Sequence, residues 1–230
     1  PRLATVLFQA LFCAGACGVI VVFLIRQGYA KREATASAVL MGLSVPLFTQ
    51  SNQIYPEIHA VLVTLFVLIL FPEWPFGAAE SRSTFHVVAA AAAVVVLPFF
   101  HQRHLILAIV LAIPILDTVR RAGLGSILTK SVVGVFALGV ITHLLYNWHY
   151  SGDIWGPFLP GNADTLGPDF LKSIPGQWID RREGLLHQAP IYVVAVFGLI
   201  RFVQVRDKRL ILFAALFVAT AGVNTLGTDW

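Results

Sequence analysis

A polar cluster lies between two uncharged apolar runs in the segment TQSNQIYPEIH, from Thr49 to His59. Pro56 and Glu57 suit the first turn of a helix, where a missing N–H costs nothing and a carboxylate favours the positive end of the helix dipole. His59 lies further along the same apolar helix, and an ionisable group there usually faces a polar cavity or a partner. We therefore predict that Glu57 and His59 line a site, where a carboxylate and an imidazole together could bind a divalent cation. The alternative is a plain helix start.

A second candidate site is the segment FFHQRHLIL, in which two imidazoles flank a guanidinium. His101, Arg103 and His104 form a group suited to holding a phosphate or pyrophosphate through charge-assisted hydrogen bonds. An interfacial turn whose cation reaches out to water would leave the same pattern. The predicted place of this segment, on the same side of the molecule as Glu57, favours the binding site.

A third candidate is the segment WIDRREGLLHQAPIYVVAVFGL, from Trp178 to Leu199. Its charges begin at Asp180 and Arg181, and polar residues continue from there to Pro190 at the entry to an apolar run. This pattern predicts the wall of a site. A solvated charge cluster at a helix entry is the alternative, because exposed ion pairs are common and contribute little.

The composition indicates a membrane protein. Of the 230 residues, 57% are hydrophobic and 12% charged, and the mean hydropathy is +0.79, which is far more apolar than a soluble domain. The net charge is +4, but aromatic residues alternate with aliphatic ones rather than with bases, so we predict no nucleic-acid partner. The GxSxG, Walker and HExxH motifs of soluble enzymes are absent. Cys13 and Cys17 are interpreted as small packing residues on one helix face.

Apolar segments near the membrane-spanning length of about 20 residues must position these candidate sites. We predict an all-α fold, a polytopic transmembrane bundle of about six to eight membrane helices that forms a single domain over residues 1–230. The fourth and fifth segments are short and could form a re-entrant pair. A run of five alanines in the fourth predicts close helix packing. The eight predicted helices are 3–25, 34–48, 55–71, 84–100, 104–116, 128–146, 187–203 and 210–226.

The distribution of Lys and Arg orients the bundle. One set of loops contains eleven of these residues and the opposite set contains five. The positive-inside rule places the first set in the cytoplasm. All three candidate sites then face the extracytoplasmic side, together with a long connection over residues 147–183. A loop of that length is usually functional.

The order of these motifs resembles the multi-spanning GT-C type glycosyltransferases of bacteria, which take polyprenyl-phosphate-linked sugars as donors. Three motifs look like the recurring elements of such proteins. They are YPE near the outer end of a helix, H-x-R between short helices, and D-x-x-x-GLL-x-x-x-P at the start of a helix after a long outer loop. The matching stretches here are SxPLFTQSNQIYPEIHA, LPFFHQRHLILA, YNWHYSGD and DRREGLLHQAPIYVVAVFGLI, followed by an apolar helix that ends in Trp230.

The resemblance implies an enzyme of the bacterial cytoplasmic membrane that transfers a sugar to an extracytoplasmic acceptor. It also implies that the general base is an acidic residue in a first outer loop, upstream of Pro1. We therefore expect this chain to be an interior piece of a longer protein.

The implied chemistry assigns roles to the candidate residues. A lipid-phosphate leaving group develops negative charge as the glycosidic bond breaks, so cations or a metal ion must stabilise it. The resemblance implies three groups of residues. His101, Arg103 and His104 would hold the phosphate, and Glu57 and His59 would orient a metal ion or the sugar. Asp180 and Arg181 would line the acceptor side, with the long loop as a lid.

Two other classes of protein stay open. The chain could be a non-catalytic subunit packed in a larger membrane assembly, with His86, His143 or His149 available to ligate pigment or haem. Each of these is predicted at or near a helix end, whereas a ligand is expected in mid-membrane. A transporter would instead carry broken helices in paired halves and charges near the midplane.

Overall fold

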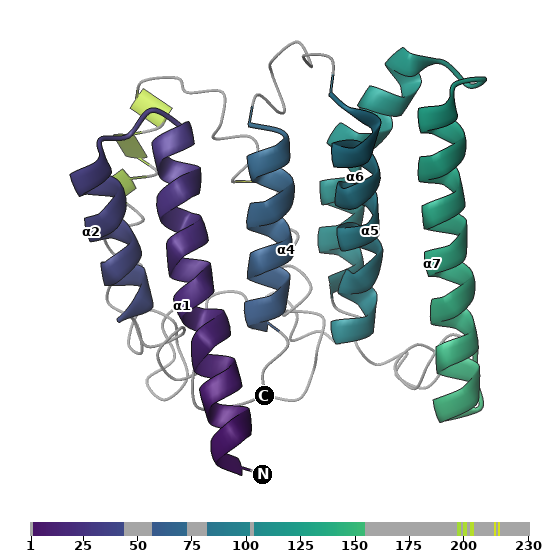
Figure 1. Cartoon of the computed structure of the whole chain (residues 1–230), viewed down its shortest axis with the longest axis horizontal. Helices are drawn as coiled ribbons and strands as arrows, with labels where there is room; N and C mark the ends of the chain where they lie inside the picture. Colours follow the sequence, from purple (N-terminus) through teal and green to yellow (C-terminus); the bar gives the residue numbers. More distant parts are fainter. Residues whose placement is uncertain are drawn as a thin grey trace, which may run out of the picture. The chain divides into compact units, whose positions relative to one another are not determined.

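The computed structural model (Figure 1) describes residues 2–43, 57–72, 82–101 and 104–154, together with eight isolated positions between 197 and 216. These residues form helices and no strand, so the predicted all-α class is confirmed over the part of the chain described. The predicted helices 187–203 and 210–226 lie almost entirely outside it. The observed helices are α1 (Arg2–Arg26), α2 (Lys31–Gly42), α4 (Glu57–Leu70), α5 (Thr84–Phe100), α6 (His104–Ala122) and α7 (Ile127–Ser151).

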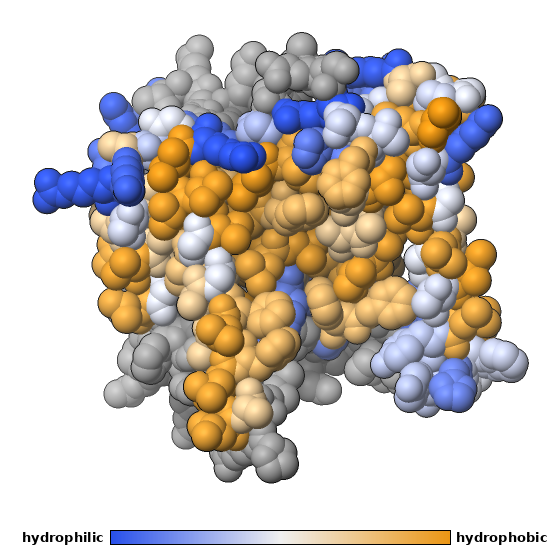
Figure 2. All heavy atoms as spheres, in the orientation of Figure 1, coloured by the Kyte–Doolittle hydropathy of each residue, from blue (hydrophilic) through white to orange (hydrophobic). Residues whose placement is uncertain are grey.

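Two of the described helices are long and apolar enough to cross a membrane, over Val6–Arg26 and Ile127–Ser151. Only 28% and 11% of these two windows is buried, so most of the residues in both windows are at least partly exposed in the described part of the chain. Figure 2 shows hydrophobic residues along the visible sides of α1 and α7 and hydrophilic residues at helix ends. This distribution is compatible with an integral membrane protein.

The chain divides into two compact units. Unit 1 comprises Pro1–Pro72 and Leu171–Ile211, and unit 2 comprises Glu73–Phe170 and Leu212–Trp230. Helices α1, α2 and α4 belong to unit 1, whereas α5, α6 and α7 belong to unit 2. The single transmembrane domain over 1–230 stays a prediction.

In unit 1, α1 packs against both α2 and α4. Its buried residues recur every three or four positions, as expected for one face of a helix, and they are Gln9, Cys13, Ala16, Ile20 and Phe23. Helices α1 and α4 run in the same direction, because Phe12 contacts His59 near the start of α4 and the Arg26 Nη1 donates to the carbonyl of Ile69 near its end, at 3.2 Å. A cation at the end of α4 also complements the helix dipole.

Helix α2 begins three residues earlier than predicted. The Ala30 N–H donates to the Glu33 carboxylate at 3.3 Å, which satisfies a backbone group that the helix itself leaves unpaired. Its last residue is Gly42, and positions 44–50 lie outside the described part. The charged residues Lys31 and Arg32 therefore belong to the helix rather than to a loop.

In unit 2, α5 lies between α6 and α7 and contributes a fully buried alanine pair. Ala90 and Ala91 are 0% exposed. A Cβ atom added to Gly139 of α7 would lie 2.6 Å from the Cβ of Val95, so the two backbones approach as closely as only glycine permits. The close packing predicted from the alanine run is confirmed.

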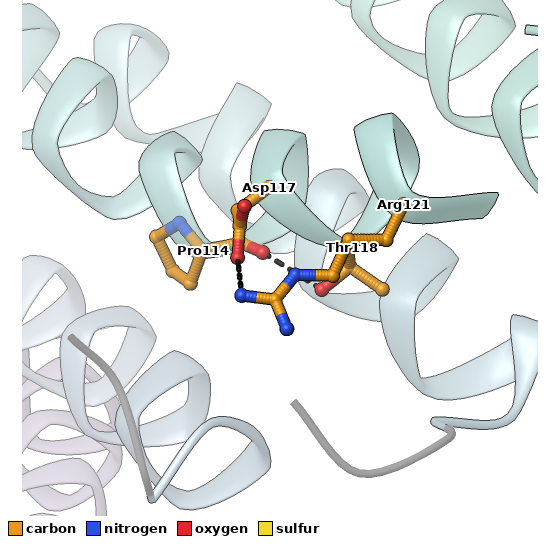
Figure 3. Close-up of polar contacts among 4 residues, drawn as sticks. All are labelled: Pro114, Asp117, Thr118 and Arg121. Carbon is orange, nitrogen blue, oxygen red and sulfur yellow. Dashed lines mark hydrogen bonds and ion pairs between the residues drawn. The ribbon is translucent and has the colours of Figure 1, made fainter. Parts of the chain in front are cut away.

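Helix α6 starts at His104 as predicted, but it ends at Ala122 rather than at residue 116. An ion pair at 2.8 Å between Asp117 and Arg121 lies along the outside of these extra turns, as Figure 3 shows. In the same turn, the Thr118 hydroxyl donates to the carbonyl of Pro114 at 2.8 Å. The resulting helix of 19 residues is longer than its apolar run, and the re-entrant pair stays a prediction.

The end of helix α7 also differs from its predicted position. The predicted helix ends at residue 146 and the predicted long loop starts at residue 147, whereas the helix continues to Ser151. Gly152 then stops it in the left-handed conformation, with φ +74°, and its N–H donates to the Trp148 carbonyl at 3.0 Å. The polar and aromatic residues of NWHYS are typical of a loop, but the helix continues through them and ends at the glycine that follows.

Candidate functional site

The first predicted site residues begin helix α4. Glu57 is its first residue, which agrees with the helix start expected from the sequence, and His59 follows two positions later. The His59 side chain is half-buried and its ring lies 4.9 Å from that of Phe12, centroid to centroid. This contact holds His59 at the interface between α1 and α4.

Gln9 is a polar residue near this interface that the sequence analysis missed. It lies one turn before Cys13 on the buried face of α1, and only 2% of its surface is exposed. Its Nε2 has no hydrogen-bond partner among the residues described. The sequence alone could have indicated Gln9, because its amide is a single polar group in an apolar segment.

The α5–α6 turn brings two of the predicted phosphate-holding residues together. His101 adopts an extended backbone that ends α5, and its carbonyl accepts the backbone N–H of His104, the first residue of α6, at 2.9 Å. The ring centroids of the two histidines are 6.2 Å apart. His104 is 8% exposed. Two imidazoles at this separation are close enough to donate to oxygens of one phosphate.

Three of the predicted site residues lie outside the described part of the chain. Arg103 falls in the turn itself, between the two histidines. Asp180 and Arg181 fall in the stretch that follows α7. Their predicted roles stay predictions.

Two further polar residues join this end of unit 2. His143 and Asn147 lie one turn apart on α7, with the His143 Nε2 3.3 Å from the Asn147 Nδ2. The ring of His143 meets that of Phe99 edge to face, at 5.0 Å between centroids. Since Phe99 precedes His101 by two residues, His143 lies beside the end of α5 that leads into the His101–His104 turn.

The longer α7 changes the position assigned to His143. The sequence analysis places this residue three positions from the end of its helix, whereas the helix continues for eight residues beyond it. His143 is therefore within the apolar helix. Its Nδ1 is buried and its Nε2 faces an amide.

Each unit has one basic end and one end rich in the predicted site residues. In unit 2, α6 runs from His104 to Arg120 and Arg121, a rise of about 25 Å at ~1.5 Å per residue. In unit 1, Arg26 and Lys31 lie at the opposite end of α1 and α2 from His59. The described histidines that carry the predicted site therefore lie away from the basic ends.

The described residues contain no group of three or more His, Cys, Asp or Glu side chains that could hold a metal ion. A divalent cation at Glu57 and His59 stays a prediction.

No family model, curated protein or solved structure matches the chain. The chemistry of the site itself therefore carries the interpretation, together with the described elements, which are all helices and include two able to cross a membrane.

Proposed function

We propose that the chain is the membrane-embedded part of a glycosyltransferase that moves a sugar from a polyprenyl-phosphate donor to an extracytoplasmic acceptor. One observation carries the proposal: the α5–α6 turn brings His101 and His104 within 6.2 Å of each other, on either side of Arg103. A turn with two imidazoles and a guanidinium offers several N–H donors to one phosphate.

The separation of charges within each unit supports an orientation in the bacterial cytoplasmic membrane. Cytoplasmic ends of membrane helices are enriched in Lys and Arg. Applied to unit 2, this rule puts Arg120 and Arg121 in the cytoplasm and the His101–His104 turn outside. Applied to unit 1, it puts Arg26 in the cytoplasm and Glu57 outside. Each unit supports the extracytoplasmic site independently.

The proposed reaction breaks the bond between the anomeric carbon of the sugar and the phosphate oxygen. The bonding electrons leave with the polyprenyl phosphate, and Arg103 with His101 and His104 stabilises the negative charge that develops there. The acceptor hydroxyl forms the new bond to the anomeric carbon and gives its proton to a carboxylate. By resemblance to GT-C enzymes, we propose that an acidic residue supplies this carboxylate.

The remaining predicted residues complete the proposal. Glu57 and His59 orient the sugar or a divalent cation, and Asp180 with Arg181 lines the acceptor side. A metal ion, where bound, would neutralise the leaving phosphate.

The test uses the full-length protein in proteoliposomes and measures release of polyprenyl phosphate, a product that is the same whichever sugar is transferred. A panel of hexose and pentose donors covers the unknown sugar. Arg103→Ala should reduce release about 100-fold or more, the loss typical of removing one donor to a developing anion. Arg120→Ala is the matched control, because this exposed arginine lies at the opposite end of α6.

Two results would contradict the proposal. If no donor in the panel releases polyprenyl phosphate, the non-catalytic membrane subunit becomes the better account. If Arg103→Ala is as active as the Arg120→Ala control, the phosphate role of the turn is wrong.

A further inference from the structure

The hydrogen bonds of Asn147 determine which nitrogen of His143 carries a proton. The Asn147 Nδ2 lies 3.3 Å from the carbonyl oxygen of Ile154, which can only accept. The same nitrogen lies 3.3 Å from the Nε2 of His143. Its two hydrogens serve both acceptors, so the Nε2 of His143 is unprotonated and the neutral ring carries its proton on Nδ1.

That Nδ1–H is a donor without an acceptor. The atom is buried and has no hydrogen-bond partner among the described residues. A buried polar group without a partner costs about 1–3 kcal/mol, and each such group in a folded protein needs an explanation. Asn147 is 6% exposed and His143 is half-buried, so the pair is a largely shielded polar unit within an apolar helix.

The neighbours of His143 indicate what the missing acceptor is. Its ring contacts Phe99 at 5.0 Å, and Phe99 leads directly into the turn where His101 and His104 lie 6.2 Å apart. His143 therefore lies beside the end of α5 that leads into the turn with the other two imidazoles. An N–H donor near two further imidazoles favours an anionic oxygen over a neutral one.

We propose that His143, oriented by Asn147, is a further binding residue for the phosphate of the lipid-linked donor, with its Nδ1–H donating to a phosphate oxygen. This inference rests on the proposed function and extends the phosphate site from the α5–α6 turn onto α7. The ring of Phe99 packs edge to face against that of His143, at 5.0 Å between centroids.

The experiment measures binding of farnesyl phosphate, a short prenyl phosphate, to the full-length protein in nanodiscs. His143→Phe keeps a ring of similar size and removes both nitrogens. It should weaken binding about tenfold, the loss expected for one hydrogen bond to a charged oxygen. Its melting temperature should change little, because the variant removes one unpaired buried donor but also removes the acceptor of one Asn147 N–H. His149→Phe is the matched control, since His149 is an exposed histidine on the same helix, and it should change neither quantity.

A second variant separates binding from packing. His143→Asn retains a side-chain N–H close to the position of Nδ1 and should recover part of the lost affinity, whereas a purely structural histidine would be replaced better by Phe. Farnesol should bind at least tenfold more weakly than farnesyl phosphate.

Four outcomes would overturn the inference: wild-type affinity in His143→Phe, equal binding of farnesol, equal binding of inorganic phosphate alone, or equal losses in the His143→Phe and His149→Phe variants.

The proposed function fails separately. If farnesyl phosphate binds through His143 but no donor sugar is transferred, the binding residue stands and the transferase does not. If transfer proceeds with unchanged KM in His143→Phe, the transferase stands and the binding residue does not.

Discussion

Replacing Gly139 with Ala tests the closest helix contact of unit 2. The new Cβ would lie 2.6 Å from the Cβ of Val95 and 3.0 Å from both of its methyl groups. A rotamer change in Val95 cannot relieve the first contact, because its Cβ is attached directly to the backbone of α5. Either the two helices separate or the backbone bends, and overpacking of this kind typically costs about 1–3 kcal/mol.

Gly134→Ala provides the reference, since a Cβ at Gly134 meets no atom within 4 Å. Both glycines lie inside α7, so both substitutions gain the same ~0.5–1 kcal/mol of helix propensity. This term cancels in the difference between the two variants. The free energy of unfolding should therefore be about 1–3 kcal/mol lower for Gly139→Ala than for Gly134→Ala.

The assay is thermal unfolding of the purified chain in detergent, followed by far-UV circular dichroism. At about 2–4 °C per kcal/mol for a chain of this size, the two melting temperatures should differ by about 2–12 °C. Val95→Gly removes the clashing atom, so Gly139→Ala should lower the melting temperature less in a Val95→Gly background than in the wild-type chain. Equal melting temperatures for Gly139→Ala and Gly134→Ala would refute the close approach of α5 and α7.

Three other substitutions test how the helices of unit 2 end and begin. Ser126→Ala removes the N-cap of α7, whose hydroxyl accepts a backbone N–H at 3.1 Å. This change should lower the free energy of unfolding by about 0.5–2 kcal/mol, whereas Ser131→Ala in the same helix should not. Gly152→Ala should cost about 1–2 kcal/mol because of its left-handed backbone, and Gly152→Asn should cost less; equal stability of the two would count against this C-cap. Asp117→Asn should change stability by less than about 1 kcal/mol, because the side chains of its ion pair are 41% and 52% exposed; a larger loss in the same melting assay would show that the pair holds the last turns of α6.

The sequence predicted where most of the described helices begin. Helix α5 matched its predicted bounds at both ends, because polar residues border an unbroken apolar run on each side. The start of α6 at His104 matched for the same reason. The ends of α6 and α7 did not, since each helix continues through polar residues beyond its apolar run, to Ala122 in α6 and up to the left-handed Gly152 in α7. Hydropathy alone does not show how far a helix continues through polar residues.

The candidate site was predicted in part. His101 and His104 are three positions apart in the sequence, so a short turn was enough to bring them together. Gln9 was missed because it stands as a single polar residue in an apolar segment, and His143 was considered only as a ligand of pigment or haem near a helix end. What makes both notable is a buried polar atom that has no hydrogen-bond partner among the described residues, and burial is a property of the packed helices.

Composition and apolar run length by themselves determined the helical class, the approximate number of helices and the ends at which polar residues gather. Only the tertiary structure decided which helix faces meet, as in the contacts of Gly139 with Val95 and of Phe99 with His143. The physical reason is that a helix apolar on all sides has no polar face to indicate which side is buried. Packing of small residues and pairing of single polar groups must then select the contact.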